Sequence, residues 1–198
     1  MPTKREEILA IAKKRGVIRA RDLVGIDGAF LRRLRDEGVL TKSARGLYSL
    51  ADYDITEAHS LVEAVQAQAK GVVCLLSAVS FHGLGTQLPF QVWLAVPNGS
   101  RISKIEPVPL RIVVMKKDAF EAGIEKHVIE GVTVPIYSVA KTVADCFKFR
   151  NKIGLDVAIE VLRAAIRDRR CSRDEIRKHA RIDRVERVMQ PYLEALSA

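Results

Sequence analysis

The sequence contains few cysteines and no long hydrophobic run. Its three cysteines are odd in number and widely spaced, and no Cys-x-x-Cys or Cys/His pairing matches a zinc module. Cys74 and Cys146 have apolar neighbours, where a thiol behaves as a small hydrophobic group. No apolar run approaches the ~18 residues of a membrane span, and the charged residues 3–7 are not followed by a signal-peptide core. We therefore expect a reduced, cytoplasmic protein with no metal and no membrane partner.

The composition fits one or two small domains with a hydrophobic core. The chain has 198 residues, of which 48% are hydrophobic, and a net charge of +9. Residues 1–50 contain 12 Lys and Arg against 6 Asp and Glu, whereas residues 51–150 contain ten of each kind. Positive charge concentrated at the N-terminus favours a polyanionic partner there, although a merely soluble basic surface is the alternative.

The first fifty residues predict three helices followed by a hairpin. Thr3 and Glu6 form a capping box at the start of the first helix, and Gly16 ends it. Asp27 can cap the third helix, which Gly38 stops. The expected ranges are 3–16, 19–24 and 27–37 for the helices and 39–50 for the hairpin.

The third helix carries the main candidate site. Phe30, Leu31 and Leu34 are expected to point inward, which leaves small and basic residues outside. The small residues let the start of the helix approach base edges and phosphates closely, and arginines can bind guanine O6 and N7 in the major groove. The alternative is a solvated helix face whose arginines pair with Asp36 and Glu37. The outward-facing candidates are Gly28, Ala29, Arg32, Arg33 and Arg35.

Four further basic residues flank this helix. Arg19 and Arg21 are expected at the start of the second helix, and Lys42 and Arg45 near the tip of the hairpin. In these places they would contact DNA phosphates, which position a protein without specifying sequence. Together the pattern predicts a winged helix-turn-helix domain over residues 1–52 that binds double-stranded DNA.

The remaining chain, residues 53–198, predicts a mixed α+β domain with antiparallel strands and terminal helices. Ser77 is expected to cap a short helix over 78–84, and Gly131 to form the turn of a hairpin over 126–136. Ser138 caps another helix, and Ser172 with Glu175 forms a second capping box. The other expected elements are helices over 55–69, 139–149, 154–169 and 183–196, and strands over 72–76, 90–97 and 110–115.

Three stretches together resemble the AbiEi family, the antitoxin component of type IV toxin–antitoxin (abortive infection) modules. They are the N-terminal winged helix that ends in Gly46–Leu50, the segment Leu76–Leu84 with Gln87–Pro89 and the strand that contains Trp93, and Lys141–Glu160. They span residues 8 to 165, and the first is common to winged helices in general. The resemblance implies a phage-defence repressor that binds inverted repeats in its own promoter. It also implies that the second domain opposes a nucleotidyltransferase-like toxin, directly or functionally.

Basic residues of the second domain are candidates for that opposing role. They could meet an acidic toxin surface, meet the nucleic acid on which the toxin works, or continue the DNA footprint. A solvated face is the alternative, because most charge runs are solvated. The candidate toxin-neutralising residues are Lys141, Lys148, Arg150 and Lys152.

Catalytic interpretations have weaker support in the sequence. Ser77 and His82 suggest a nucleophile and base, but no Gly-x-Ser-x-Gly elbow surrounds the serine, and a hydrogen-bonded histidine is the simpler interpretation. Asp145 near Lys141 and Lys148 is more simply a helix-surface or subunit salt bridge. The acidic residues Asp118, Glu121, Asp145 and Glu160 match no metal motif. We therefore expect no catalytic residue, no metal site and no cofactor.

Two other functions stay open at this stage. The protein could be a stand-alone winged-helix transcription factor whose second domain dimerises or senses a ligand. It could also be an enzyme that modifies nucleic acid and uses the winged helix to reach its substrate.

Overall fold

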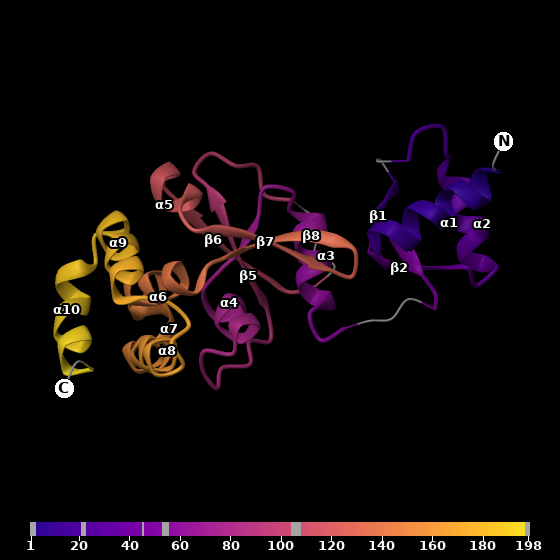
Figure 1. The fold of residues 1–198 in the computed structure, drawn as a ribbon. Helices are drawn as coiled ribbons and strands as arrows, with labels where there is room; N and C mark the ends of the chain where they lie inside the picture. Colours follow the sequence, from indigo (N-terminus) through magenta and orange to yellow (C-terminus); the bar gives the residue numbers. More distant parts are fainter. Residues whose placement is uncertain (1–2, 21–22, 45, 53–55, 104–107, 197–198) are drawn as a thin grey trace. The chain divides into compact units, whose positions relative to one another are not determined.

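A computed structural model describes residues 3–20, 23–44, 46–52, 56–103 and 108–196. The chain divides into two compact units (Figure 1). The first comprises residues 1–69, 102–108 and 127–134, and the second comprises 70–101, 109–126 and 135–198. The first unit therefore extends beyond residue 52, and the domain boundary at that residue stays a prediction.

The first unit begins with two helices and a small antiparallel sheet. Thr3 and Glu6 form the expected capping box, and the Asp27 carboxylate accepts a hydrogen bond from the Phe30 amide at 2.7 Å. Leu31 and Leu34 are buried against Ile8 on the first helix. The strand order is β1-β3-β2. The elements are α1 (Lys4–Arg15), β1 (Ile18–Arg19), α2 (Gly28–Asp36), β2 (Leu40–Ala44), β3 (Leu47–Leu50) and α3 (His59–Ala67).

The prediction of a second helix over 19–24 is wrong at the start of that range. Arg19 lies in strand β1, where it pairs with Leu47 of β3. Val17 and Ile18 are both buried, and β-branched residues at this point favour an extended chain that joins the sheet. Residues 21–22 lie outside the described part of the chain.

The buried carboxylate of Glu130, which lies in a turn, binds residues at the start of α3. The side chain of Glu130 accepts hydrogen bonds from the Thr56 amide at 2.7 Å and the Thr56 hydroxyl at 2.9 Å. Its other oxygen lies 2.7 Å from His59 Nδ1, and His59 Nε2 lies 3.8 Å from the Glu63 carboxylate. Burial by itself would raise the pKa of Glu130, but the bonds from His59 and Thr56 outweigh it and lower the pKa below the usual 4.5.

Glu130→Gln should destabilise the protein by about 1–3 kcal/mol, because hydrogen bonds to a charged acceptor are lost at a buried site. A carboxyl with a lowered folded pKa stabilises the fold above its unfolded pKa, and this contribution is lost as the pH falls through the folded value. The difference from wild type should therefore shrink below pH 4.5. Urea unfolding across pH measures it, with the exposed Glu57→Gln as control; a pH-independent difference would contradict the assignment.

The second sheet has the order β6-β5-β4-β8-β7 and is mixed rather than antiparallel. Strand β5 pairs parallel with β6, and Val73 of β4 pairs parallel with Ile136 of β8. The expectation of antiparallel strands is thus wrong for these two pairs. The connection over 98–109 is long enough to return the chain to the same end of the sheet. The strands are β4 (Val72–Val73), β5 (Val92–Pro97), β6 (Leu110–Met115), β7 (Ile124–Ile129) and β8 (Val132–Tyr137).

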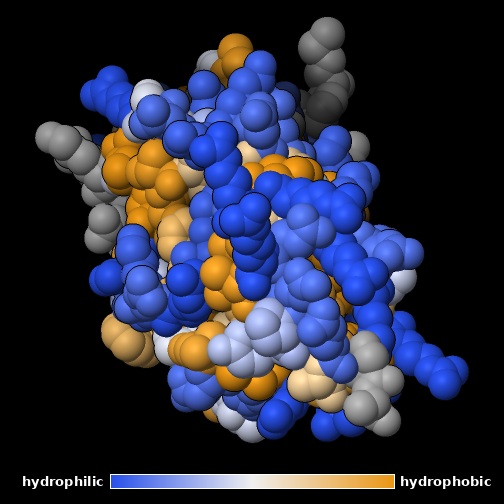
Figure 2. Space-filling view, turned by 90° about the vertical axis from the view of Figure 1, so that its left-hand side faces the viewer, coloured by the Kyte–Doolittle hydropathy of each residue, from blue (hydrophilic) through white to orange (hydrophobic). Residues whose placement is uncertain are grey.

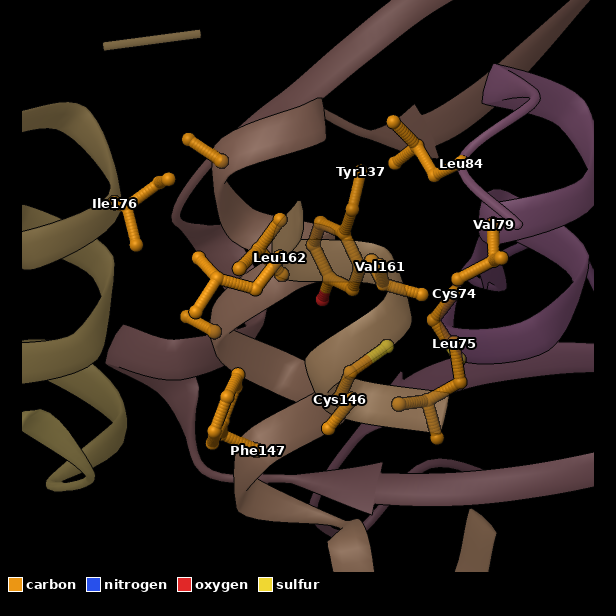
Figure 3. Close-up of a cluster of buried hydrophobic side chains, with 14 of the residues drawn as sticks. Cys74, Leu75, Val79, Leu84, Tyr137, Cys146, Phe147, Val161, Leu162 and Ile176 are labelled. Carbon is orange, nitrogen blue, oxygen red and sulfur yellow. The ribbon is translucent and has the colours of Figure 1, made fainter. Parts of the chain in front are cut away.

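The helices of the second unit pack around one hydrophobic core. Figure 3 shows residues of α4, α6, α8 and α9 converging on Tyr137 and Cys146, and each labelled side chain is buried. Ser138 and the Ser172–Glu175 capping box start α6 and α9 as expected. The helices are α4 (Leu75–His82), α5 (Lys117–Glu121), α6 (Val139–Lys148), α7 (Arg150–Ile153), α8 (Leu155–Arg167), α9 (Arg173–Asp183) and α10 (Glu186–Ala195).

Ser77 does not cap a helix, contrary to expectation. Helix α4 already begins at Leu75, and Ser77 lies inside it. Its hydroxyl accepts a hydrogen bond from the Trp93 amide at 2.9 Å, which ties α4 to strand β5. Cys74 and Leu75 are fully buried, so packing extends the helix toward its N-terminus past the residue that the local pattern favours as a cap.

Candidate nucleic-acid interface

Helix α2 presents the small and basic face that the sequence predicts. The buried side chains of Leu31 and Leu34 fix the orientation of the helix, and Asp27 caps its start. A side chain at Gly28 would meet nothing within 4 Å, so the start of the helix is open to an approaching ligand. The exposed residues of this face are Gly28, Ala29, Arg32, Arg33 and Arg35.

The three arginines differ in their intramolecular partners. Arg33 Nε lies 2.9 Å from one oxygen of Glu37, and the other oxygen lies 2.8 Å from Nη1 of Arg5 on α1. Arg35 pairs with its neighbour Asp36 at 2.6 Å. Arg32 forms no hydrogen bond or ion pair with the described residues, and it is exposed. Its guanidinium therefore needs to break no contact before it binds a ligand.

The hairpin contributes an exposed lysine beside this helix. Lys42 lies in β2, in register with Tyr48 of β3, and its side chain is exposed. Gly46 has a φ of +79°, a conformation that glycine adopts readily at a tight bend. Two of the predicted phosphate contacts, Arg21 and Arg45, lie outside the described residues.

Arg19 does not lie at the start of a helix, where the sequence predicts it to contact a DNA phosphate. Its guanidinium Nη1 donates a hydrogen bond to the Gln66 carbonyl of α3 at 3.2 Å, and the side chain is partly buried. The position in β1 directs this arginine toward α3. The sequence pattern could not reveal this, because Gln66 follows 47 residues later.

Lys141 is fully buried, which corrects its assignment as a surface contact. Its ammonium pairs with Asp145 on the next turn of α6 and lies 3.0 Å from Asp183 of α9. Lys148 joins the network at 2.9 Å from Asp183 and keeps part of its side chain in solvent. The predicted salt bridge with Asp145 is thus present, but it lies in the core and not on a helix surface.

Burial sets the ionisation of this network. Burial raises the pKa of Asp145 to about 8, although the charge of Lys141 opposes the rise. Burial also lowers the pKa of His179, with Lys141 acting in the same direction. One oxygen of Asp145 and Nδ1 of His179 are buried without a hydrogen-bond partner. The network therefore links α6 to α9 and presents no surface charge at Lys141.

Of the remaining basic candidates, Arg150 and Lys152 lie on α7. Arg150 is half-buried and donates a hydrogen bond to the Phe147 carbonyl at 2.9 Å. Lys152 is exposed, with its ammonium 5.6 Å from the centre of the Phe149 ring. Figure 2 shows a mostly hydrophilic surface on the side of α9 and α10, with smaller apolar areas between the charged side chains.

Ser77 and His82 are not arranged as a nucleophile and base. His82 is buried and its Nε2 lies 2.7 Å from the Tyr137 carbonyl, as expected for a hydrogen-bonded histidine. Within the described ranges, no three His, Cys, Asp or Glu side chains gather closely enough to hold a metal ion. None of the helices in those ranges combines the length and apolar character needed to cross a membrane.

The fold is similar to that of a solved protein, and the N-terminal segment matches a family. The RV2827C protein from Mycobacterium tuberculosis superimposes with a TM-score of 0.61 at 15% identity, over 90% of this chain and 71% of that one. At this identity the likeness concerns the fold alone. A comparison with curated protein sequences finds no match. Residues 6–51, which contain α2 and the β1-β3-β2 sheet, match the model of the family described as "Transcriptional regulator, AbiEi antitoxin", and this confirms the resemblance inferred from the sequence.

Proposed function

We propose that this protein is the antitoxin and transcriptional autorepressor of a type IV toxin–antitoxin operon, active in the cytoplasm in phage defence. A winged helix-turn-helix over residues 1–52 binds inverted repeats in the operon's promoter. The domain over residues 53–198 opposes a nucleotidyltransferase-like toxin. Neither role requires an enzymatic activity of this chain.

The observation that carries the proposal is the exposed arginine face of α2. It lies within the segment that matches a family of antitoxin regulators. A short helix of this kind, with small residues at its start and a basic hairpin beside it, fits the major groove and its flanking phosphates. Arg32 and Arg33 would contact bases, and Arg35 and Lys42 would hold the backbone.

A gel-shift with the DNA upstream of the operon tests the repressor role. We expect a specific complex that a scrambled duplex of equal length does not compete away.

Co-expression with the product of the neighbouring gene tests the antitoxin role, and growth should be rescued. The exposed or half-buried residues Lys148, Arg150 and Lys152 are the candidates for this role, and a variant with all three neutralised should rescue less well. Failure of the wild-type protein to rescue would remove the antitoxin role while leaving the repressor role intact.

Lys42→Ala should weaken binding to specific and scrambled DNA by the same factor. The reason is that a phosphate contact carries no sequence information. The slope of log affinity against log salt concentration should fall by about one unit, because one fewer counterion is released. Fluorescence anisotropy across a salt series measures both effects, and Lys70→Ala, outside the hairpin, is the matched control. A loss confined to the specific duplex would contradict the phosphate assignment.

A further inference from the structure

A groove lies between helix α8 and the loop that follows α4. Its volume is about 670 Å³. The loop contributes Gly85 and Thr86, and the Thr86 amide donates a hydrogen bond to the Glu160 carboxylate of α8 at 2.9 Å. A Cβ atom at Gly85 would lie 3.3 Å from Glu160, so glycine lets the loop approach the helix closely. Loop and helix thus form one defined surface of the second unit.

The charges along the groove face of α8 have an ordered arrangement. Asp156, Glu160, Arg163 and Arg167 all line the groove, and spacings of four, three and four residues place them on one face of the helix. The two acidic residues lie in the N-terminal half and the two arginines in the C-terminal half. This face is therefore complementary to a second copy of itself in the antiparallel orientation.

Most of these charges are available to a partner. Asp156 and Arg163 are exposed and form no ion pair with the described residues. Arg167 pairs with its neighbour Asp168 at 2.7 Å, but the arginine side chain is 76% exposed and the pair can exchange.

Two exposed apolar side chains follow on the same loop. Leu88 is 90% exposed and Phe90 is 85% exposed, and they come directly after the groove residues Gly85 and Thr86. Exposed apolar surface often marks interaction sites, and aromatic side chains frequently dominate the binding energy of interfaces.

We propose that this groove face is the contact surface between two copies of the chain. A two-fold axis would cross α8 midway between Glu160 and Arg163. Asp156 would then face the partner's Arg167, and Glu160 would face the partner's Arg163. A parallel arrangement would bring like charges together, so charge selects the antiparallel one. Leu88 and Phe90 supply apolar area beside the helix pair. A two-fold dimer would also match inverted repeats, and only this consequence rests on the proposed function.

Charge reversal tests the contact on the full-length protein. Sedimentation velocity from about 1 to 100 µM should show a monomer–dimer equilibrium for the wild type, a range suited to a small interface. Arg167→Asp and Asp156→Arg should each weaken dimerisation at least ~10-fold, because each brings like charges together across the axis. The double variant restores opposite charges, so its dissociation constant should return to within about threefold of wild type. Arg187→Asp makes the same charge change on α10 and should leave dimerisation unchanged.

Phe90→Ser should also weaken dimerisation while circular dichroism stays that of wild type, since this side chain makes little contact in the monomer. A wild type that stays monomeric throughout the range overturns the inference. So does a dimer that the two charge reversals leave intact, or a double variant that fails to recover. Binding of each variant to a duplex with a single half-site is measured in parallel. Retained half-site binding by a monomeric protein would leave the repressor role standing while this contact fails.

Discussion

Arg32→Ala is expected to weaken binding to the specific operator by about 1–3 kcal/mol, the range for a bidentate arginine–guanine contact. The exposed guanidinium of Arg32 forms no ion pair with the described residues, so no ion pair has to break when it binds DNA. Arg33, in contrast, must exchange its contact with Glu37, which also binds Arg5. Arg32→Ala should therefore cost more than Arg33→Ala, and the double variant should lose about 2 kcal/mol or more.

Anisotropy titrations on operator and scrambled duplexes at one fixed salt concentration measure these losses. The loss for Arg32→Ala should be concentrated on the operator, because a base contact adds little to non-specific binding. Arg187→Ala removes an exposed arginine from α10 and serves as the matched control. If the double variant binds the operator as wild type does, the assignment of α2 as the recognition helix is wrong.

Lys141→Met should destabilise the fold by about 3–5 kcal/mol, the usual cost of removing one partner from a buried ion pair. The ammonium of Lys141 contacts both Asp145 and Asp183, and none of these three side chains is exposed. Methionine fills a similar volume but leaves the buried side chains of Asp145 and Asp183 without this cation. Lys148→Met should cost clearly less, because Lys148 is partly solvated and Asp183 keeps its bond to Lys141.

The wild type should lose stability as the pH rises from the unfolded pKa of Asp145, 3.8, to the folded value of about 8, and the variant, which lacks the opposing charge of Lys141, should go on losing stability above pH 8. A carboxyl whose pKa is raised in the folded state stabilises the fold at low pH, and this contribution disappears as the pH rises through that window. Urea unfolding at several pH values measures the effect. Adding Asp145→Asn to Lys141→Met should recover part of the stability, since no unpaired buried charge remains at that position. A Lys141→Met protein as stable as wild type would contradict the burial of this network.

Local patterns predicted four of the helix starts and the turn of the second hairpin. Thr3, Asp27, Ser138 and Ser172 all cap helices as expected, because a cap depends on a hydrogen bond to an amide three residues away. The turn at Gly131 follows from a positive φ that glycine tolerates. The buried side chains of Leu31 and Leu34 follow from helical periodicity alone.

Residues whose partners lie far along the chain were harder to interpret. The sequence pattern predicts that Lys141 is a basic surface residue. In the structure its ammonium is buried in the core, where it pairs with Asp183 of α9. Arg19 binds a carbonyl 47 residues away, and Ser77 binds a strand amide 16 residues away. Partners at such separations leave no periodic signal in the sequence.

The sequence by itself determined the exposed basic face of α2 and its match to a family of antitoxin regulators, since both depend on residues close together in the chain. The tertiary structure alone decided which cations stay on the surface and which strands run parallel. It also decided that a groove forms beside α8. The physical reason is that burial, sheet pairing and ion pairing between distant segments depend on how the whole chain packs. The packing of the whole chain competes with the local preference of each segment for helix, strand or turn.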